Sequence, residues 1–253
     1  MAISFDMLGS GSTGNCGLMV VNGQHILIDA GFSCKKLKDM LSSRNVDIND
    51  IRAVFITHEH IDHIQGLRGL RKYGNIQFFA NKLTADAIEK KFEFGINWRT
   101  FNTGDNVIFS GINIMSFSIP HDAADPIGYV FSAIEKKDGG INSLAWMTDL
   151  GYIPSNIVSC IKDADLLVIE SNYDNDLLTA DSKRPPYIKA RIRSRYGHLP
   201  NEAAINFVKN AKDGRWKKVV FAHVSADCNS DDSIKSLLGN TEHLSFEYDI
   251  ASA

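Results

Sequence analysis

The sequence predicts an α/β (α+β) fold in which two mixed sheets pack face to face, with helices on their outer faces. Short apolar runs of strand length recur through the first third and the middle of the chain, and helical periodicity follows several of them. The last third alternates strands with helices. Two strand-rich halves that each carry helices bury their apolar surface when the sheets stack. With 253 residues, 44% of them hydrophobic, we expect a single domain over residues 1–253.

The first segment is predicted to form a meander of three strands over residues 2–8, 17–21 and 25–31. Asn22 and Gly23 are a typical two-residue hairpin turn between the last two strands. The loop after the first strand, residues 9–15, reads GSGSTGN and has the glycine spacing of a dinucleotide-binding fingerprint. That fingerprint requires a helix after its third glycine, whereas a strand follows here. We therefore expect no bound dinucleotide.

Helical and strand patterns alternate after the meander. Buried strands are expected to begin at Ile51 and to span residues 76–81. Ser33 is expected to cap the first helix and Thr84 the third, and the second helix contains Gly66. The three expected helices span residues 33–45, 62–74 and 84–92.

The middle of the chain is rich in strand patterns separated by Gly and Asn turns, within residues 104–122, 127–135 and 143–151. Two strand-and-helix units close the chain. Their expected elements are a helix over residues 154–161, a strand over 164–171, a longer helical tract ending near Lys212, a strand over 217–224, and a final helix and strand.

Composition limits the possible functions. A net charge of -3 excludes the global positive field of many nucleic-acid-binding proteins, so any site for a polyanion must be local. The four cysteines lack C-x-x-C spacing, which argues against a zinc ribbon or a disulfide scaffold. No apolar run approaches the roughly 18 residues that a membrane span needs. We expect a cytoplasmic protein with no membrane partner, and the sequence does not indicate its oligomeric state.

The strongest functional signal is the segment THEHIDH, directly after the strand that begins at Ile51. His58, His60, Asp62 and His63 are four ligand-type side chains in a turn between a strand and a helix. In extended backbone His58 and His60 point to the same side, while Asp62 and His63 can serve a neighbouring ion. The alternative is a solvated polar turn that carries histidines by chance. The density of ligand-type residues favours a metal site.

Three later residues stand in matching positions at the ends of strands: His121, Asp149 and His223. Each one, taken alone, is equally well explained as a buried, hydrogen-bonded residue. Together with the first cluster they complete two metal sites. Nitrogen and carboxylate ligands without a thiolate suit Zn²⁺ or Mn²⁺, and the residue types do not distinguish these two ions.

This order of ligand residues resembles that of the metallo-β-lactamase superfamily, dinuclear hydrolases with a four-layer αβ/βα sandwich. The segments LGSGSTGN, THEHIDH, PHDAADPIGYVF, TDLGY, IESNYD and GHLPNEAA are similar to its bacterial YycJ/WalJ-like branch, which is related to the tRNA 3′-end processing and RNase J-type nucleases. The resemblance implies two divalent metal ions, Zn or Mn. It assigns His58, His60 and His121 to the first ion, Asp62, His63 and His223 to the second, and Asp149 as the bridge.

The resemblance also implies phosphodiester hydrolysis through a metal-bridging hydroxide, with Asp62, Asp149 and His198 as catalytic residues. His198 is interpreted as a general acid or phosphate contact, and the alternative is a helix-capping or surface histidine. A nuclease is expected, with DNA 5′→3′ exonuclease activity in repair favoured by the resemblance. The other possibilities are hydrolysis of a small cyclic or other phosphodiester and a non-catalytic metal-binding role.

Nucleic acid is the expected substrate because a basic run stands immediately before His198. Within this run Arg191 and Arg193 are predicted to contact phosphates, although a solvated helix face would have the same composition. In the glycine-rich loop, Ser12 and Asn15 are predicted to donate to a phosphate oxygen of the substrate.

Overall fold

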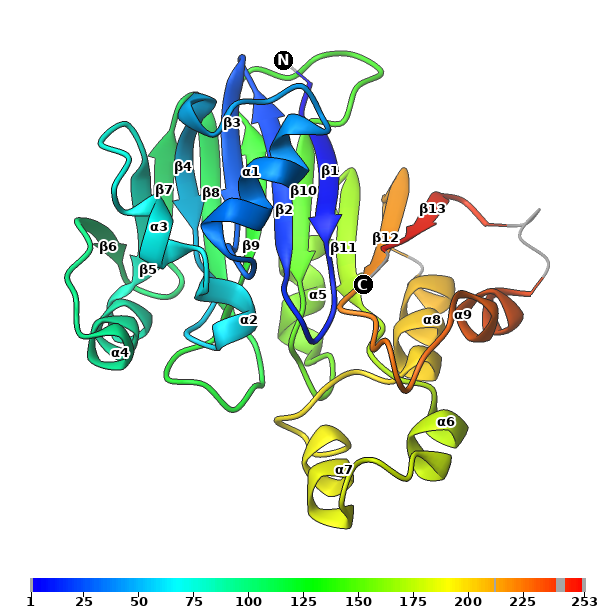
Figure 1. The fold of residues 1–253 in the computed structure, drawn as a ribbon. Coiled ribbons are helices and arrows are strands. Elements are labelled where there is room, and N and C mark those ends of the chain that lie inside the picture. Colours follow the sequence, from blue (N-terminus) through cyan, green and yellow to red (C-terminus); the bar gives the residue numbers. More distant parts are fainter. Residues whose placement is uncertain (1, 212, 240–243, 252–253) are drawn as a thin grey trace.

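Two mixed β-sheets pack face to face in the computed structural model, which describes residues 2–211, 213–239 and 244–251 (Figure 1). In the first sheet an antiparallel meander is followed by parallel strands. Its strands lie side by side in chain order: β1 (Ser4–Gly9), β2 (Cys16–Val21), β3 (Gln24–Ile28), β4 (Ile51–Phe55), β5 (Gln77–Asn81) and β6 (Trp98–Phe101).

The second sheet repeats this plan, because antiparallel strands β7 to β10 are followed by parallel strands β10 to β13. Its strands again lie in chain order: β7 (Asn106–Phe109), β8 (Ile112–Ser118), β9 (Ile127–Ala133), β10 (Ser143–Met147), β11 (Leu166–Glu170), β12 (Lys218–Ala222) and β13 (Glu247–Ile250). The carboxyl ends of parallel strands share one edge of a sheet, so side chains that follow β3, β4, β10, β11 and β12 can meet there.

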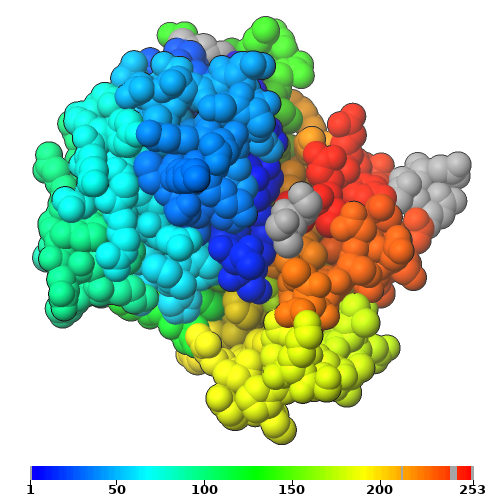
Figure 2. Space-filling model, viewed as in Figure 1, coloured from blue at the N-terminus to red at the C-terminus, as the bar shows by residue number. Residues whose placement is uncertain are grey.

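Helices cover the outer face of each sheet. The first sheet carries α1 (Cys34–Ser42), α2 (Ile61–Ile64), α3 (Leu67–Leu70) and α4 (Lys82–Phe92), with a short 3₁₀ turn at Ile48–Asp50. The second carries α5 (Ser155–Ile161), α8 (Asn201–Asn210) and α9 (Asp231–Leu238). The segment with α6 (Asn175–Ala180) and α7 (Pro186–Ile192) projects below the sheets as a yellow lobe (Figure 2).

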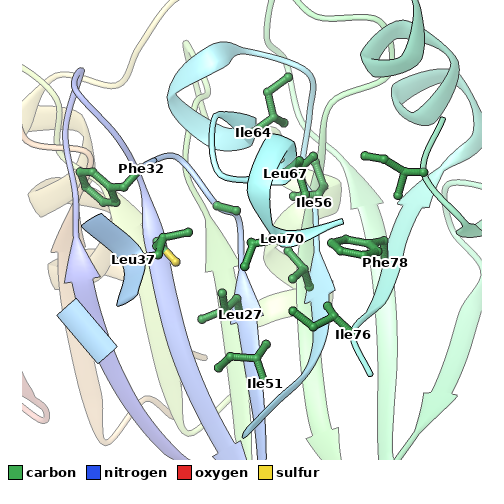
Figure 3. Packing of buried hydrophobic residues seen from close by; sticks show 14 of the residues in the cluster. Leu27, Phe32, Leu37, Ile51, Ile56, Ile64, Leu67, Leu70, Ile76 and Phe78 are labelled. Atoms are coloured by element: carbon green, nitrogen blue, oxygen red, sulfur yellow. The ribbon is translucent and has the colours of Figure 1, made fainter. Parts of the chain in front are cut away.

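Both faces of the central strands are buried, which explains their nearly continuous apolar sequences. Along β3, Ile26 and Ile28 face the other sheet, whereas Leu27 faces the helices. Between the sheets, the Phe55 ring stacks on Phe79 with centroids 4.4 Å apart. Figure 3 shows the outer layer, in which residues of β3, β4 and β5 meet residues of α1, α2 and α3. The result is the four-layer sandwich expected from the sequence.

Several sequence predictions about single elements are confirmed. The hairpin turn at Asn22 and Gly23 has positive φ at both residues, 53° and 70°, and joins β2 to β3. A strand rather than a helix follows the glycine-rich loop, which agrees with the absence of a dinucleotide fingerprint. Ser33 caps α1 by accepting a hydrogen bond from the backbone N–H of Lys36. The final helix and strand are α9 and β13.

The helix predicted over residues 62–74 is wrong in extent, because the chain forms two single turns, α2 and α3, on either side of Gln65 and Gly66. The Gly66 N–H donates to the Ala30 carbonyl at 2.8 Å instead of continuing one helix. A side chain at position 66 would lie 2.7 Å from the Phe32 carbonyl oxygen. Only glycine allows this close approach of two backbones.

The predicted Thr84 cap is also wrong, because α4 begins two residues earlier. Asn81 is the cap, and its side chain accepts a hydrogen bond from the Thr84 N–H at 2.9 Å. The edge strand β6 was not predicted from its sequence.

The long helical tract predicted before the strand over residues 217–224 is three helices, α6, α7 and α8, because Pro185, Pro186 and Pro200 end the helical pattern twice. Its expected end near Lys212 lies outside the described residues. Among the helices that the structure describes, none has the length and apolar character needed to cross a membrane.

We predict that Gly31→Ala lowers the free energy of unfolding by about 3 kcal/mol. A Cβ at position 31 would lie 1.8 Å from the Asp62 carbonyl oxygen and 2.4 Å from the Asn15 nitrogen, so backbone segments must move apart. Gly74→Ala is the matched control, since nothing lies within 4 Å of its Cβ, and it should change stability by less than about 0.5 kcal/mol. Urea denaturation of the three proteins tests this, and equal midpoints would contradict it.

Candidate metal centre

The seven residues predicted as metal ligands converge at one edge of the two sheets. His58 and His60 follow β4, Asp62 and His63 lie in α2, and the other three follow β8, β10 and β12: His121, Asp149 and His223. Their ligand atoms, together with those of Glu170 and His198, form overlapping groups, and within each group all ligand atoms lie within 4.8 Å of one another. These groups are His58, His60 and His121; His58, His63 and Asp149; Asp62, His63 and His223; and Asp149, Glu170, His198 and His223.

The first three-residue group consists of histidine nitrogens that face one another. His60 Nδ1 and His121 Nε2 are 3.2 Å apart, and the His58 ring is 4.6 Å from the His60 ring between centroids. The opposite nitrogens are occupied, since His121 Nδ1 donates to the Gly197 carbonyl and His58 Nδ1 contacts the Thr57 hydroxyl. These contacts leave the three facing nitrogens available for one ion.

The second group combines Asp62, His63 and His223. Asp62 Oδ2 lies 3.4 Å from His63 Nε2 and 3.5 Å from His223 Nε2. Asp149 stands between the two groups, because its Oδ2 is 3.2 Å from His63 Nε2 while its Oδ1 is 3.2 Å from His223 Nε2 and 3.8 Å from His121 Nε2. Asp149 therefore has the position that a bridging carboxylate requires.

The residues fit divalent cations. His58 Nε2 is buried and has no hydrogen-bond partner among the described residues, and His223 Nε2 and Asp149 Oδ2, although each lies 3.2 Å from another ligand atom, form no hydrogen bond of good geometry there. Leaving such a group unsatisfied costs about 1–3 kcal/mol, so three of them in one cavity indicate a missing partner. Burial lowers the pKa of His58 well below its usual value, which keeps the imidazole neutral and its lone pair free.

The carboxylates of the site are negatively charged. Burial alone would raise the pKa of Asp149, but the charges on His223 and His63 outweigh this effect and hold the pKa well below its usual range. Asp62 behaves in the same way, since its burial is outweighed by His63 and His223 and its pKa is lowered. These carboxylates stay ionised because positive charge lies beside them, and bound metal ions can supply that charge in place of protonated His63 and His223.

Asp29 contributes to the site but was not identified from the sequence. This fully buried carboxylate accepts hydrogen bonds from the Thr57 N–H at 2.8 Å and from His63 Nδ1 at 2.8 Å. The second contact orients His63 so that Nε2 faces the other ligands. A signal was present, because Asp29 and Asp149 both follow an apolar strand, both precede glycine by two residues, and both adopt left-handed backbone, with φ of 59° and 62°.

Glu170, at the end of β11, was also missed. Its Oε1 accepts a hydrogen bond from His198 Nδ1 at 2.7 Å and lies 3.2 Å from His223 Nδ1, while its Oε2 accepts from the Leu150 N–H at 2.8 Å. One buried carboxylate thus orients two histidines and the residue after Asp149. His198 is half-buried, and its ring lies parallel to that of His223 at 5.1 Å between centroids.

The ligand groups open into a pocket of about 310 Å³ lined by Ser12, His60, Ile61, Asp62, Lys91, His121, Asp149, Arg191, His198 and His223. Of the predicted substrate residues, the structure brings Ser12 and Arg191 to this pocket. Asn15 lies buried beneath it, and its amide Nδ2 is 3.3 Å from Asp62 Oδ2. Arg193 is not brought to the pocket, because its guanidinium donates to the Thr179 hydroxyl and the Asn175 carbonyl of α6.

A family model for the β-lactamase superfamily domain matches residues 24–224 of the chain. The exodeoxyribonuclease YycJ of Bacillus anthracis is 34% identical over 238 residues, covering 90% of this chain and 85% of that protein. The exodeoxyribonuclease WalJ of Streptococcus pneumoniae is 34% identical over 234 residues, covering 90% and 84%. The metallo-β-lactamase fold protein YhfI of Bacillus subtilis matches 100% of this chain and 97% of its own, with a TM-score of 0.74 and 16% identity. The predicted resemblance and fold class are confirmed.

We predict that Asp29→Asn lowers metal affinity by about 10- to 100-fold. An amide in place of Oδ2 would donate to His63 Nδ1, which moves the imidazole proton to Nε2 and blocks the nitrogen that faces Asp149 and Asp62. Competition titration against a chelator measures the affinity. Asp47→Asn is the control, since this carboxylate lies on the surface at a 3₁₀ turn. Equal affinities of Asp29→Asn and wild type would contradict the orienting role.

Proposed function

The chain belongs to the β-lactamase superfamily, and from this membership we propose that the protein is a metal-dependent exodeoxyribonuclease. The observation that carries the proposal is the match in sequence, across nine-tenths of the chain, to two proteins that are named exodeoxyribonucleases. The open pocket beside the ligand groups supports it, because a polymer can reach the site from solvent. We further propose a single cytoplasmic domain that acts in DNA repair with Zn²⁺ or Mn²⁺.

In this proposal His58, His60 and His121 hold one ion, Asp62, His63 and His223 hold the other, and Asp149 joins them. Two bound divalent ions supply a hydroxide at neutral pH and stabilise the charge that develops on the phosphoryl oxygens. Asp62 and Asp149 also orient the attacking water, since both line the pocket and a carboxylate there can accept its hydrogen bonds.

His198 delivers the proton to the leaving alkoxide. Its Nδ1 is bonded to Glu170, so the other ring nitrogen, Nε2, is the one that can carry a proton to the substrate. Burial would raise the pKa of Glu170, but the charge on His198 outweighs this and lowers the pKa. The ionised Glu170 in turn accepts the hydrogen bond from His198 Nδ1 and holds the ring in place.

Four residues are proposed to serve substrate binding, three of them on the strand itself and Asn15 by positioning the glycine-rich loop. The exposed Ser12 hydroxyl donates to a phosphate oxygen at the pocket wall, and Arg191 contacts a phosphate at its mouth. Asn15 acts through the loop, since its Oδ1 accepts from the Gly11 N–H at 3.0 Å and so keeps the loop against the ligands. Arg193, on the α6 side of α7, contacts the strand farther from the scissile bond.

The test is cleavage by metal-loaded protein of end-labelled single-stranded and duplex DNA, of RNA, and of a chromogenic small phosphodiester, with metal content measured in parallel. We expect stepwise shortening of DNA from the 5′ end. Cleavage of the small phosphodiester alone would favour the small-substrate alternative. No cleavage with any metal by a fully loaded protein would favour the non-catalytic one.

We predict that His198→Ala lowers kcat on DNA by about 10²- to 10⁴-fold, the usual contribution of a general acid. Metal content should remain that of the wild type, because His198 is outside both assigned ligand sets. The pH profile should lose the limb that reports the acid. His25→Ala, a half-buried histidine of β3 far along the sheet from the site, is the matched control. An unchanged kcat in His198→Ala would refute the assignment.

A further inference from the structure

Two basic side chains reach the metal pocket from different layers of the molecule. Lys91 stands in the last turn of α4, which covers the first sheet, and Arg191 stands in α7, in the lobe between β11 and β12 of the second sheet. In Figure 1, α4 and α7 lie on either side of α2, the helix that carries Asp62 and His63. Both side chains are exposed, and both line the pocket.

Each cation is tied to a loop that carries histidines of the first ligand group. Lys91 Nζ donates at 2.8 Å to the carbonyl of Glu59, the residue between His58 and His60. Arg191 Nε donates at 2.6 Å to Asp122, the residue after His121. The two loops are joined, because the Ala124 N–H donates to Glu59 Oε1 at 2.9 Å.

Together these bonds form a continuous series of contacts along the three-histidine edge of the pocket. The series runs from Lys91 through the Glu59 and Asp122 loops to Arg191, so a cation stands at each end. Arg191 pairs with Asp122 through Nε alone, and Lys91 forms no ion pair, among the residues that the structure describes. Its single bond is to an uncharged carbonyl, so two N–H groups of the ammonium remain free to donate.

A lysine near the carboxyl end of a helix is often present only because it favours the helix dipole. Lys90 meets that description equally well, since it is exposed in the same turn of α4. Lys91 differs in two respects, because its ammonium reaches a carbonyl 32 residues earlier in the chain and because it lines the metal pocket. The dipole explains neither of these contacts.

We propose that Lys91 and Arg191 form a two-sided clamp for the phosphates that flank the scissile one on a polynucleotide strand. The strand crosses the three-histidine edge of the pocket, with one flanking phosphate at α4 and the other at α7. This inference rests on the proposed function and specifies its substrate class, since only a polymer has phosphates on both sides of the bond that is cut. A small phosphodiester engages neither end of the clamp fully.

The clamp is tested with metal-loaded protein and a fluorescein-labelled DNA whose phosphorothioate linkages resist hydrolysis. Binding is measured by fluorescence anisotropy over a range of salt concentrations. We expect Lys91→Gln and Arg191→Gln each to weaken binding by about fivefold to tenfold at low salt and to reduce the slope of log K against log salt by about 0.7 to 0.9, as for one lost phosphate contact. The double variant should lose both contacts additively.

Lys90→Gln is the matched control for charge and should bind as the wild type does. Lys91→Arg retains the charge and should restore the salt slope, which separates the ammonium's charge from any effect on the Glu59 loop. Steady-state assays should show a larger loss on DNA than on a small phosphodiester for Lys91→Gln, mainly in KM. Metal content and the thermal midpoint of each variant establish that the ligand loops remain intact.

Lys91→Gln and Lys90→Gln with the same affinity and salt slope would overturn the clamp, as would a double variant no weaker than either single one. A failure of the proposed function is distinguishable from this result. Wild-type protein that binds DNA with the predicted salt dependence but cleaves no DNA with any metal would retain the clamp and refute the nuclease.

Discussion

The contacts of Asp149 with histidines from both sheets are the interaction on which the rest of the structure depends. Asp149 lies 3.2 Å from His63, which comes after β4 of the first sheet, and 3.2 Å from His223, which comes after β12 of the second. Both Asp149 and His223 adopt left-handed backbone, with φ of 62° and 56°. Such backbone costs about 1–3 kcal/mol of free energy per residue, and the packing of the surrounding core must offset this cost. The packing of the two sheets fixes the strand ends of one sheet relative to those of the other. The ligand groups form only because these strand ends keep their relative positions.

The glycine-rich loop helps to hold these strand ends in their relative positions. The Ser10 hydroxyl accepts the His223 N–H from the other sheet, and it donates to Asn15 Oδ1 at 3.3 Å. The Asn15 backbone N–H in turn donates to the Asp62 backbone carbonyl at 2.8 Å, and the Asn15 carbonyl accepts from the Gly31 N–H at 2.9 Å. The loop that resembles a nucleotide fingerprint therefore connects the two sheets through the hydrogen bonds of Ser10 and Asn15. Its buried polar residues hold ligand segments, and its exposed Ser12 is left at the pocket.

The sequence contained most of the site because ligand-type residues cluster in THEHIDH and at apolar strand ends, and both are local patterns. Asp29 and Glu170 also stand at the ends of apolar strands, but their roles depend on partners 34 and 28 residues away, which a strand-end carboxylate does not by itself identify. The same reason explains the errors in the fold. Gly66 interrupts a helix through the distant Ala30 carbonyl. Arg193 donates to the Thr179 hydroxyl and therefore does not reach the pocket, although it belongs to the same basic run before His198 as Arg191.

The segment between β11 and α8 is separate from the strand ends that carry the ligand residues. It leaves and rejoins the sheet at one point, since the Asn172 N–H donates to the Leu199 carbonyl and the Asn201 N–H donates to the Tyr173 carbonyl, each at 2.9 Å. The excursion between these bonds carries both His198 and Arg191. The ligand residues, by contrast, lie at strand ends fixed by the two cores. In the proposed function, a change in the length or composition of this excursion would therefore alter what reaches the ligand groups without disturbing the strand ends that hold them, and substrate choice would lie in α6 and α7.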